Sequence, residues 1–223
     1  MVDVSAVLFD VDGTLVDSNY LHVYAWTRAF EEAGIAVESW RIHRSIGMDG
    51  ANLIESLSGD ADDDAQKQAE ELHTRYLKEA APLLRPLPGA RELLQRVRSL
   101  GLQVVLASSA GEDELAMSRK VLDCDDLVSA ATSSKDVDVA KPDPTIIEIA
   151  MERAGVDADH AVYVGDAVWD VIACGRAGVP AIGLLSGGIS REELEKAGAE
   201  AVFENPRDLC AHIGSTTIGT LGS

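Results

Sequence analysis

Acidic, hydroxyl and lysine side chains stand at four places in this sequence where an apolar run ends or a helix is expected to begin. The first is the stretch AVLFDVDGTLVDS, in which a short apolar run is followed by two carboxylates that are two positions apart. Like charges at the end of a buried segment repel each other unless they face water or share a cation. The full set is Asp10 and Asp12 in FDVDGTL, Ser108 and Ser109 in LASSAG, Lys141 in AKPDP, and Asp166 and Asp170 in VGDAVWD.

These residue types suit the transfer of a phosphoryl group. If Asp10, Asp12 and Asp166 converge, a divalent cation must join them, and ligands that are all oxygen favour a hard ion such as Mg2+. One carboxylate can then attack phosphorus as a nucleophile, while another protonates the leaving oxygen and later activates water. Lys141 and the Ser108 hydroxyl can bind the phosphoryl oxygens, together with backbone N–H groups beside Asp10 and at the start of the helix after LASS.

The elements that must position these residues follow from the spacing of apolar residues. After Gly89, short apolar runs alternate with segments of helical periodicity, and this alternation predicts crossover units and a parallel sheet. We expect strands at 4–9, 103–107, 127–130, 161–164, 181–185 and 201–203, and helices at 90–100, 112–122, 144–154, 167–177 and 192–197. Ligands of such sheets bind beyond the carboxyl ends of the strands, which is where the polar set stands.

The segment between the first two strands has a different character. It contains helical patterns near 19–33, 39–46, 50–57 and 62–80 and no strand-like run, and the proline-rich stretch 82–89 resembles a linker. The fold class is therefore predicted as α/β, with a doubly wound, Rossmann-like parallel sheet and an inserted all-α cap. We expect residues 1–17 and 86–223 to form the α/β core and 18–85 the cap, with a flexible tail at 214–223.

Composition limits the partners. The net charge of −19 disfavours a nucleic acid or an anionic membrane but leaves room for a small phosphorylated metabolite, because screening lets a local cationic site act against the global charge. No window approaches the roughly 18 to 20 apolar residues of a membrane span, and no secretory signal is recognisable. Three widely spaced cysteines indicate neither a disulfide framework nor a zinc site, and they favour a cytoplasmic location. A monomer or homodimer is expected, and the sequence does not decide between them.

Each position also has a purely structural interpretation. Asp-Gly between apolar residues is a hairpin-turn signal, and Ser108 could cap the helix that follows it. Lys141 could be a surface lysine before a helix that starts with proline. Asp170 could be an exposed acid in the first turn of a helix. The sequence alone leaves these alternatives open at each single site.

The four motifs in their order resemble the haloacid dehalogenase-like hydrolase superfamily, over essentially the whole chain. DVDGTL resembles its first motif, LASSA its second, KPDP its third and GDAVWD its acidic fourth, while the helical insert resembles the small α-helical cap of the phosphoglycolate phosphatase and β-phosphoglucomutase group. The resemblance implies that Asp10 is the nucleophile, Asp12 the general acid/base, and Ser108 and Lys141 the groups that bind the phosphoryl oxygens.

The resemblance also implies a metal site and further substrate contacts. The Mg2+ ligands would be the Asp10 carboxylate, the backbone carbonyl of Asp12 and the Asp166 carboxylate, with Asp170 one helical turn later in a supporting role. Thr14 in the first motif and Ser109 in the second complete the predicted substrate-binding positions of the core.

Three cap residues are candidates for substrate contact. Arg44 and Gly47, in HRSIGMDG, fall where cap residues of related phosphatases reach the substrate, although a helix end with a solvent-facing arginine explains them equally well. His22, in DSNYLHVYAW, resembles a histidine that lies near the site of β-phosphoglucomutase, and packing at the cap hinge is its alternative.

The resulting prediction is a Mg2+-dependent phosphatase that hydrolyses a small-molecule phosphomonoester through an aspartyl-phosphate. A sugar phosphomutase of the β-phosphoglucomutase type is the main alternative, because it uses the same intermediate. A dehalogenase has no leaving oxygen for Asp12 to protonate, and a phosphonate hydrolase requires a cap lysine, for which only Lys67 and Lys78 are present, both late in the insert. A binding protein without catalysis is disfavoured because every catalytic position is filled.

Overall fold

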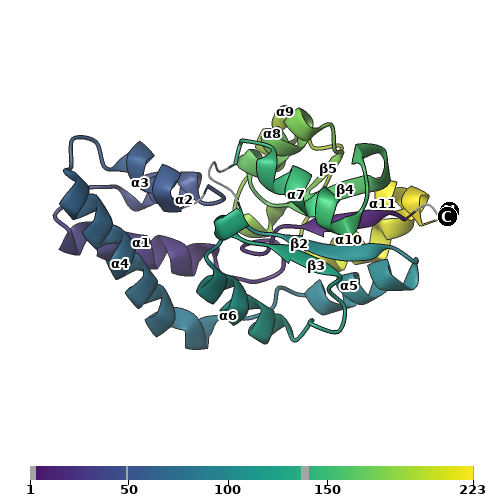
Figure 1. Ribbon diagram of the computed structural model, residues 1–223, viewed down its shortest axis with the longest axis horizontal. Coiled ribbons are helices and arrows are strands. Elements are labelled where there is room, and N and C mark those ends of the chain that lie inside the picture. Colours follow the sequence, from purple (N-terminus) through teal and green to yellow (C-terminus); the bar gives the residue numbers. More distant parts are fainter. Residues whose placement is uncertain (1–3, 49, 137–140, 223) are drawn as a thin grey trace.

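The computed structural model describes residues 4–48, 50–136 and 141–222, and it confirms the predicted fold class (Figure 1). A six-stranded, all-parallel sheet has the order β3-β2-β1-β4-β5-β6. Its strands are β1 (Ala6–Phe9), β2 (Gln103–Ala107), β3 (Ala130–Thr132), β4 (Ala161–Gly165), β5 (Ala181–Leu184) and β6 (Ala201–Phe203). Strand β1 lies at the centre, where the strand order reverses, and this is the place at which such sheets bind ligands.

Helices cover both faces of the sheet because alternate strand residues point to opposite sides. From β1, Val7 and Phe9 pack on one face and Ala6 and Leu8 on the other. The first face is covered by α5 (Ala90–Ser99), α6 (Glu112–Leu122), α10 (Pro206–His212) and α11 (Thr217–Leu221), and the second by α7 (Thr145–Ala154), α8 (Val168–Ala177) and α9 (Arg191–Ala197). The central strands β1, β4 and β5 are fully buried, which explains their continuous apolar sequences, whereas the edge strands β3 and β6 are partly exposed.

The helical insert has its own apolar core and extends from one end of the sheet, at the left of Figure 1. It consists of α1 (Asn19–Glu32), α2 (Ser39–Ser45), α3 (Gly50–Leu57) and α4 (Asp63–Ala80). The two chain segments that join it to the sheet are hydrogen-bonded to each other, since the Asp17 N–H donates to the Arg85 carbonyl at 2.9 Å and the Leu87 N–H to the Leu15 carbonyl at 2.9 Å. No helix in the described part of the chain is long and apolar enough to cross a membrane.

The C-terminal part of the chain differs from the expectation of a flexible tail at 214–223. In the described residues 214–222, the chain forms α11, and Ile218 is fully buried in the apolar core beside Ile213. The Gly/Thr/Ser-rich composition of this segment did not indicate the helix α11, because the burial of one isoleucine is enough to anchor a short helix. The preceding helix α10 was also missed, although Asn205 caps it by accepting from the N–H groups of Arg207 and Asp208.

Strand β3 begins later than predicted. The apolar residues near 127 belong to a turn, in which the N–H groups of Leu127 and Val128 donate to the Cys124 carbonyl. The sheet pairing starts only at Ala130, which lies opposite Val105 of β2. An apolar turn and an edge strand give the same sequence signal, and this accounts for the shift.

Candidate active site

The loop after β1 carries Asp10 and Asp12 to the carboxyl edge of the sheet. Asp10 is almost buried, with 7% of its surface exposed, and its N–H donates to the Val164 carbonyl of the neighbouring strand at 2.9 Å. Gly13 follows with a φ of +75°, and a side chain there would place its Cβ 2.5 Å from an oxygen of Asp166. The loop can therefore turn tightly beside Asp166 only because residue 13 is glycine.

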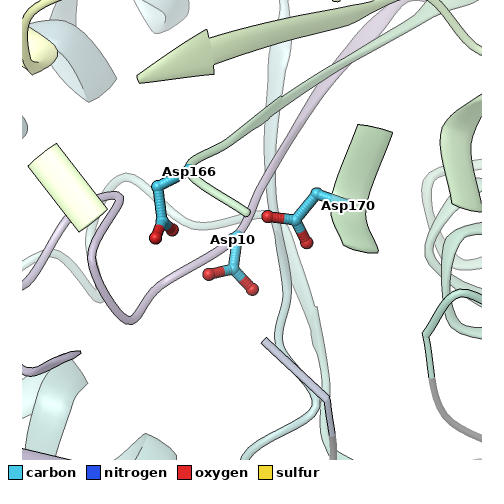
Figure 2. Close-up of side chains that lie close together, drawn as sticks. All are labelled: Asp10, Asp166 and Asp170. Carbon is cyan, nitrogen blue, oxygen red and sulfur yellow. The ribbon is translucent and has the colours of Figure 1, made fainter. Parts of the chain in front are cut away.

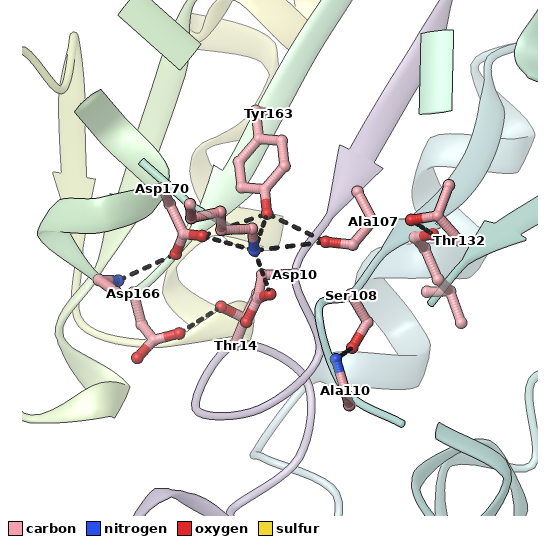
Figure 3. A network of polar contacts seen from close by, with 12 residues as sticks. Asp10, Thr14, Ala107, Ser108, Ala110, Thr132, Tyr163, Asp166 and Asp170 are labelled. Atoms are coloured by element: carbon pink, nitrogen blue, oxygen red, sulfur yellow. Dashed lines mark hydrogen bonds and ion pairs between the residues drawn. The ribbon is translucent and has the colours of Figure 1, made fainter. Parts of the chain in front are cut away.

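Lys141 joins two of the carboxylates, those of Asp10 and Asp170. Figure 3 shows these two carboxylates in one polar network with Tyr163. The ammonium nitrogen of Lys141 is buried and lies 2.8 Å from an oxygen of Asp10, 2.8 Å from an oxygen of Asp170 and 2.8 Å from the Tyr163 hydroxyl. Burial by itself would lower the pKa of Lys141, but the two carboxylates outweigh it and raise this pKa well above its usual value. Lys141 is therefore a permanent buried cation and not a surface lysine.

Asp166 completes a group of three buried carboxylates with Asp10 and Asp170 (Figure 2). One oxygen from each lies within 4.8 Å of the others. The Asp166 carboxylate accepts from the Thr14 hydroxyl at 2.8 Å and from the Asn19 amide at 2.9 Å. Burial raises the pKa of Asp166 well above its usual value, and the charges of Asp10 and Asp170 add to this. Burial likewise raises the pKa of Asp10, to about 7, although Lys141 opposes the shift.

This acidic group fits a hard divalent cation. Its donor atoms are all oxygens, and three carboxylates against the one ammonium of Lys141 leave two negative charges uncompensated. The side-chain oxygen of Asn19 is also buried without a partner among the described residues, so that a hydrated ion could satisfy it. Both oxygens of Asp170 are already engaged, one by Lys141 and the other by the Ala167 N–H, which suits a supporting role better than direct ligation.

Asp12 is separate from this group and faces the insert. Its carboxylate accepts from the Ser18 hydroxyl at 2.6 Å and lies 3.4 Å from Nε2 of His22. Burial would raise the pKa of Asp12, but the hydrogen bonds from His22 and Ser18 outweigh it and lower this pKa. The other ring nitrogen of His22 lies 3.3 Å from Nε2 of His73, on the opposite cap helix α4. The structure thus places His22 against Asp12, at the junction between cap and sheet.

A cavity of about 360 Å³ opens above Asp10 and Asp12, between the sheet edge and the cap. Ser108 and Ser109 line it from the end of β2, where the Ser108 oxygen accepts from the Ala110 N–H at 3.1 Å. This hydrogen bond is similar to the helix-capping contact that was the structural alternative for Ser108, but Ser108 also lines the cavity. Asp10, Asp12, Ser108 and Asp166, which were predicted from separate motifs, therefore border one space, and Lys141 contacts it through Asp10.

The predicted substrate-binding residues are only partly brought to this cavity. Gly47 lines it with a φ of +99°, and a Cβ there would lie 2.8 Å from that of Ala167, so the cap approaches the sheet closely at this point. Thr14 holds Asp166 and does not line the cavity. Arg44 does not line it either, because its guanidinium pairs with Glu193 at the start of α9 and this pair is about 40% exposed on each side.

Three residues that hold the site together were not identified from the sequence. Tyr163 donates to the Ala107 carbonyl at 3.2 Å and contacts both Lys141 and Asp170. Asn19 and His73 position Asp166 and His22, respectively. Only Tyr163 offered a signal, since a phenol inside the otherwise aliphatic run AVYVG needs a buried polar partner.

An Arg44→Ala variant should change kcat/KM by less than about fivefold, because an exposed ion pair contributes about 0–1 kcal/mol and this one lies outside the cavity. Steady-state kinetics with the best substrate would measure the effect, and Glu193→Gln, which removes the other partner, is the matched control. A large rise in KM for Arg44→Ala alone would instead place Arg44 on the substrate.

Comparison with known proteins identifies the class. Residues 7–184 match the family of haloacid dehalogenase-like hydrolases, and the chain belongs to this family. A phosphoglycolate phosphatase of Rhodospirillum rubrum is 30% identical over 213 residues, which are 90% of this chain and 87% of that protein. A phosphorylated carbohydrates phosphatase of Thermotoga maritima is 28% identical over 204 residues, covering 89% and 94% of the two chains.

Solved structures agree with this assignment. The crystal structure of a hydrolase from Pseudomonas syringae superposes with a TM-score of 0.90 at 37% identity, covering 95% of this chain and 98% of that one. A putative β-phosphoglucomutase from Thermotoga maritima gives a TM-score of 0.70 at 27% identity, with 95% and 99% covered. The predicted resemblance to the phosphoglycolate phosphatase and β-phosphoglucomutase group is thereby confirmed.

Proposed function

We propose that this protein is a Mg2+-dependent phosphatase that hydrolyses a small-molecule phosphomonoester through an aspartyl-phosphate on Asp10. The observation that carries the proposal is that Asp10, Lys141 and Asp166 meet beneath one cavity whose wall also contains Ser108. The names of the phosphatase relatives support the reaction class.

Asp10 is suited to attack phosphorus. Lys141 binds one of its oxygens at 2.8 Å, which fixes the orientation of the carboxylate, and Asp10 lines the cavity. Asp10, the carbonyl of Asp12 and Asp166 would hold Mg2+, which when bound offsets the charge of the carboxylates and of the phosphoryl oxygens. Ser108 and the N–H groups at the start of α6 would bind the phosphoryl oxygens not taken by the ion.

Asp12 would transfer the proton in both half-reactions. With its pKa lowered by His22 and Ser18, it is ionised in the free enzyme, which is the form that activates water against the aspartyl-phosphate. An anionic phosphoryl group beside it favours the protonated form, which the leaving oxygen needs in the first half-reaction. His22 acts on the substrate through Asp12 in this proposal, as a positioning residue.

A phosphomutase is the second candidate, because the chain resembles a β-phosphoglucomutase structure in fold at 27% identity. Such an enzyme returns the phosphoryl group to a sugar and does not release it to water.

We also propose a cytoplasmic location, which is consistent with the free state of Cys124, Cys174 and Cys210.

A screen of phosphorylated metabolites with and without Mg2+, in which free phosphate and isomerised product are counted separately, tests the function. We expect Mg2+-dependent phosphate release to exceed isomerisation for every sugar monophosphate. Faster isomerisation of one of them would establish the mutase instead. No phosphate release from any compound, p-nitrophenyl phosphate included, would overturn the proposed activity.

A further inference from the structure

The cavity carries an excess of negative charge, and this bears on which phosphomonoester the proposed phosphatase accepts. Five carboxylates line it, and no lysine or arginine is among its described lining residues. The five are Asp10, Asp12, Glu70, Glu114 and Asp166. In the proposed function Asp10, Asp12 and Asp166 would surround the phosphoryl group, where Lys141 and a divalent ion would compensate them. Glu70 and Glu114 lie on the cap helix α4 and on α6, away from these three.

The cationic residues of the cap are committed elsewhere. Of its seven lysines and arginines, five form ion pairs outside the cavity, Lys67 is exposed on α4, and Arg85 donates to the carbonyls of Pro82 and Leu84. The pairs are Arg28 with Glu79, Arg41 with Glu38, Arg44 with Glu193, Arg75 with Glu32 and Lys78 with Asp113. The residues outside the described ranges, at 1–3, 49, 137–140 and 223, include no lysine or arginine in the sequence.

The two histidines of the cavity do not supply a free positive charge. Nε2 of His22 lies 3.4 Å from the Asp12 carboxylate, so the His22 ring is engaged by Asp12. His73 is 5% exposed and stacks on Trp26 with ring centroids 4.0 Å apart. Burial lowers the pKa of His73 well below its usual value, so that its imidazole is neutral. An anion on the leaving group would meet no free cationic side chain among the described lining residues.

The same wall is well supplied with acceptors for hydroxyl groups. The Glu114 side chain is 19% exposed, and its carboxylate lies 3.8 Å from Nδ1 of His73. Thr74 and Ser134 also line the cavity, while Ile46, Met48 and Leu53 give it an apolar side. Its volume of about 360 Å³ is at the lower end of the range of about 300–1,000 Å³ for small-molecule sites.

From these features, and on the basis of the proposed phosphatase activity, we propose that the substrate is the phosphomonoester of a neutral polyhydroxyl molecule of monosaccharide size. Carboxylates such as Glu114 accept hydrogen bonds from hydroxyl groups, whereas a carboxylate or second phosphate on the leaving group meets like charge without a cation. The same charge disfavours a bisphosphate, which a sugar phosphomutase must form and hold.

The test compares kcat/KM for phosphate release, with Mg2+ present, among substrates that differ in the charge of the leaving group. Glucose 6-phosphate and glycerol 3-phosphate represent neutral polyols, 2-phosphoglycolate a carboxylate, and pyrophosphate and fructose 1,6-bisphosphate a second phosphate. We expect the better polyol phosphate to exceed each of the other three by about tenfold or more.

Charge variants on α6 connect this preference to the cavity wall. Glu114→Lys should shift the ratio of kcat/KM toward 2-phosphoglycolate by about tenfold, and Glu114→Gln should shift it in the same direction by less. Glu112→Lys is the matched control, because Glu112 lies on the same helix, is 58% exposed and pairs with Lys135 outside the cavity. This control should leave the ratio unchanged.

The outcomes separate the substrate proposal from the activity on which it rests. Release from p-nitrophenyl phosphate together with equal or better turnover of 2-phosphoglycolate or pyrophosphate would overturn the substrate class alone. An identical shift in Glu112→Lys and Glu114→Lys would remove Glu114 as its determinant. Absence of release from every compound would reject the phosphatase itself.

Discussion

An Asp10→Asn variant is expected to lose at least about 10⁴-fold in kcat, because removal of a nucleophile ordinarily abolishes all but binding and electrostatic effects. The amide has nearly the same shape as the carboxylate but cannot form the aspartyl-phosphate. Its oxygen can still accept from Lys141, which is 2.8 Å from the present carboxylate. The variant should therefore lose turnover but keep its affinity for the substrate. Steady-state kinetics would measure the turnover, and isothermal titration calorimetry would measure the affinity.

The fold should survive this substitution. Burial raises the pKa of Asp10 to about 7, so a neutral amide at this position is expected to leave the fold intact. Circular dichroism and thermal unfolding provide the check, with Asp17→Asn, an exposed residue seven positions later, as the matched control. Substantial activity in Asp10→Asn, with the fold intact, would remove Asp10 as nucleophile.

Removal of divalent ions is expected to stop phosphate release completely and also to change stability in a pH-dependent way. Without a cation, the folded protein holds a proton on Asp10 more tightly than the unfolded chain does, since the pKa rises from 3.8 to about 7. The contribution of Asp10 to the free energy of unfolding is therefore greatest below about pH 4, and it is lost as the pH rises through 7. Mg2+ competes with that proton, so it should stabilise the protein more at pH 7.5 than at pH 5.5.

Differential scanning fluorimetry with and without Mg2+ at both pH values would measure this difference. Asp166→Asn should abolish the Mg2+-dependent rise in Tm, whereas Asp136→Asn, whose carboxylate pairs with Arg153 outside the acidic group, should retain it. Full activity in excess EDTA, or a larger Mg2+ effect at pH 5.5, would contradict the metal assignment.

The sequence was sufficient for the sheet and for the convergence of its polar residues. Parallel strands must present their carboxyl ends at one edge, so Asp10, Ser108 and Asp166 could be placed together from strand positions alone. The KPDP motif predicted that Lys141 belongs to the site, and the structure adds that Lys141 joins Asp10 to Asp170. This part depends on backbone topology, which apolar periodicity encodes directly.

The contacts between cap and core could not be obtained in the same way. Arg44 and Glu193 are 149 positions apart, and neither neighbourhood indicates the other. The direction of a long side chain depends on which cap face meets the sheet, and that is a property of tertiary packing and not of local pattern. Asn19 illustrates the same limit, because its role depends on Asp166, which is 147 positions away.

The bonds of Asp12 have a consequence for how such enzymes diversify. Its carboxylate is held by Ser18 and His22, which belong to the first residues of the insert, whereas Asp12 itself belongs to the loop of the sheet. In the proposed mechanism the two parts of the chain would therefore share one proton-transfer unit and would not be independent modules. A cap transplanted from a relative would bring new specificity with working chemistry only if the start of its first helix supplied an equivalent hydroxyl and imidazole.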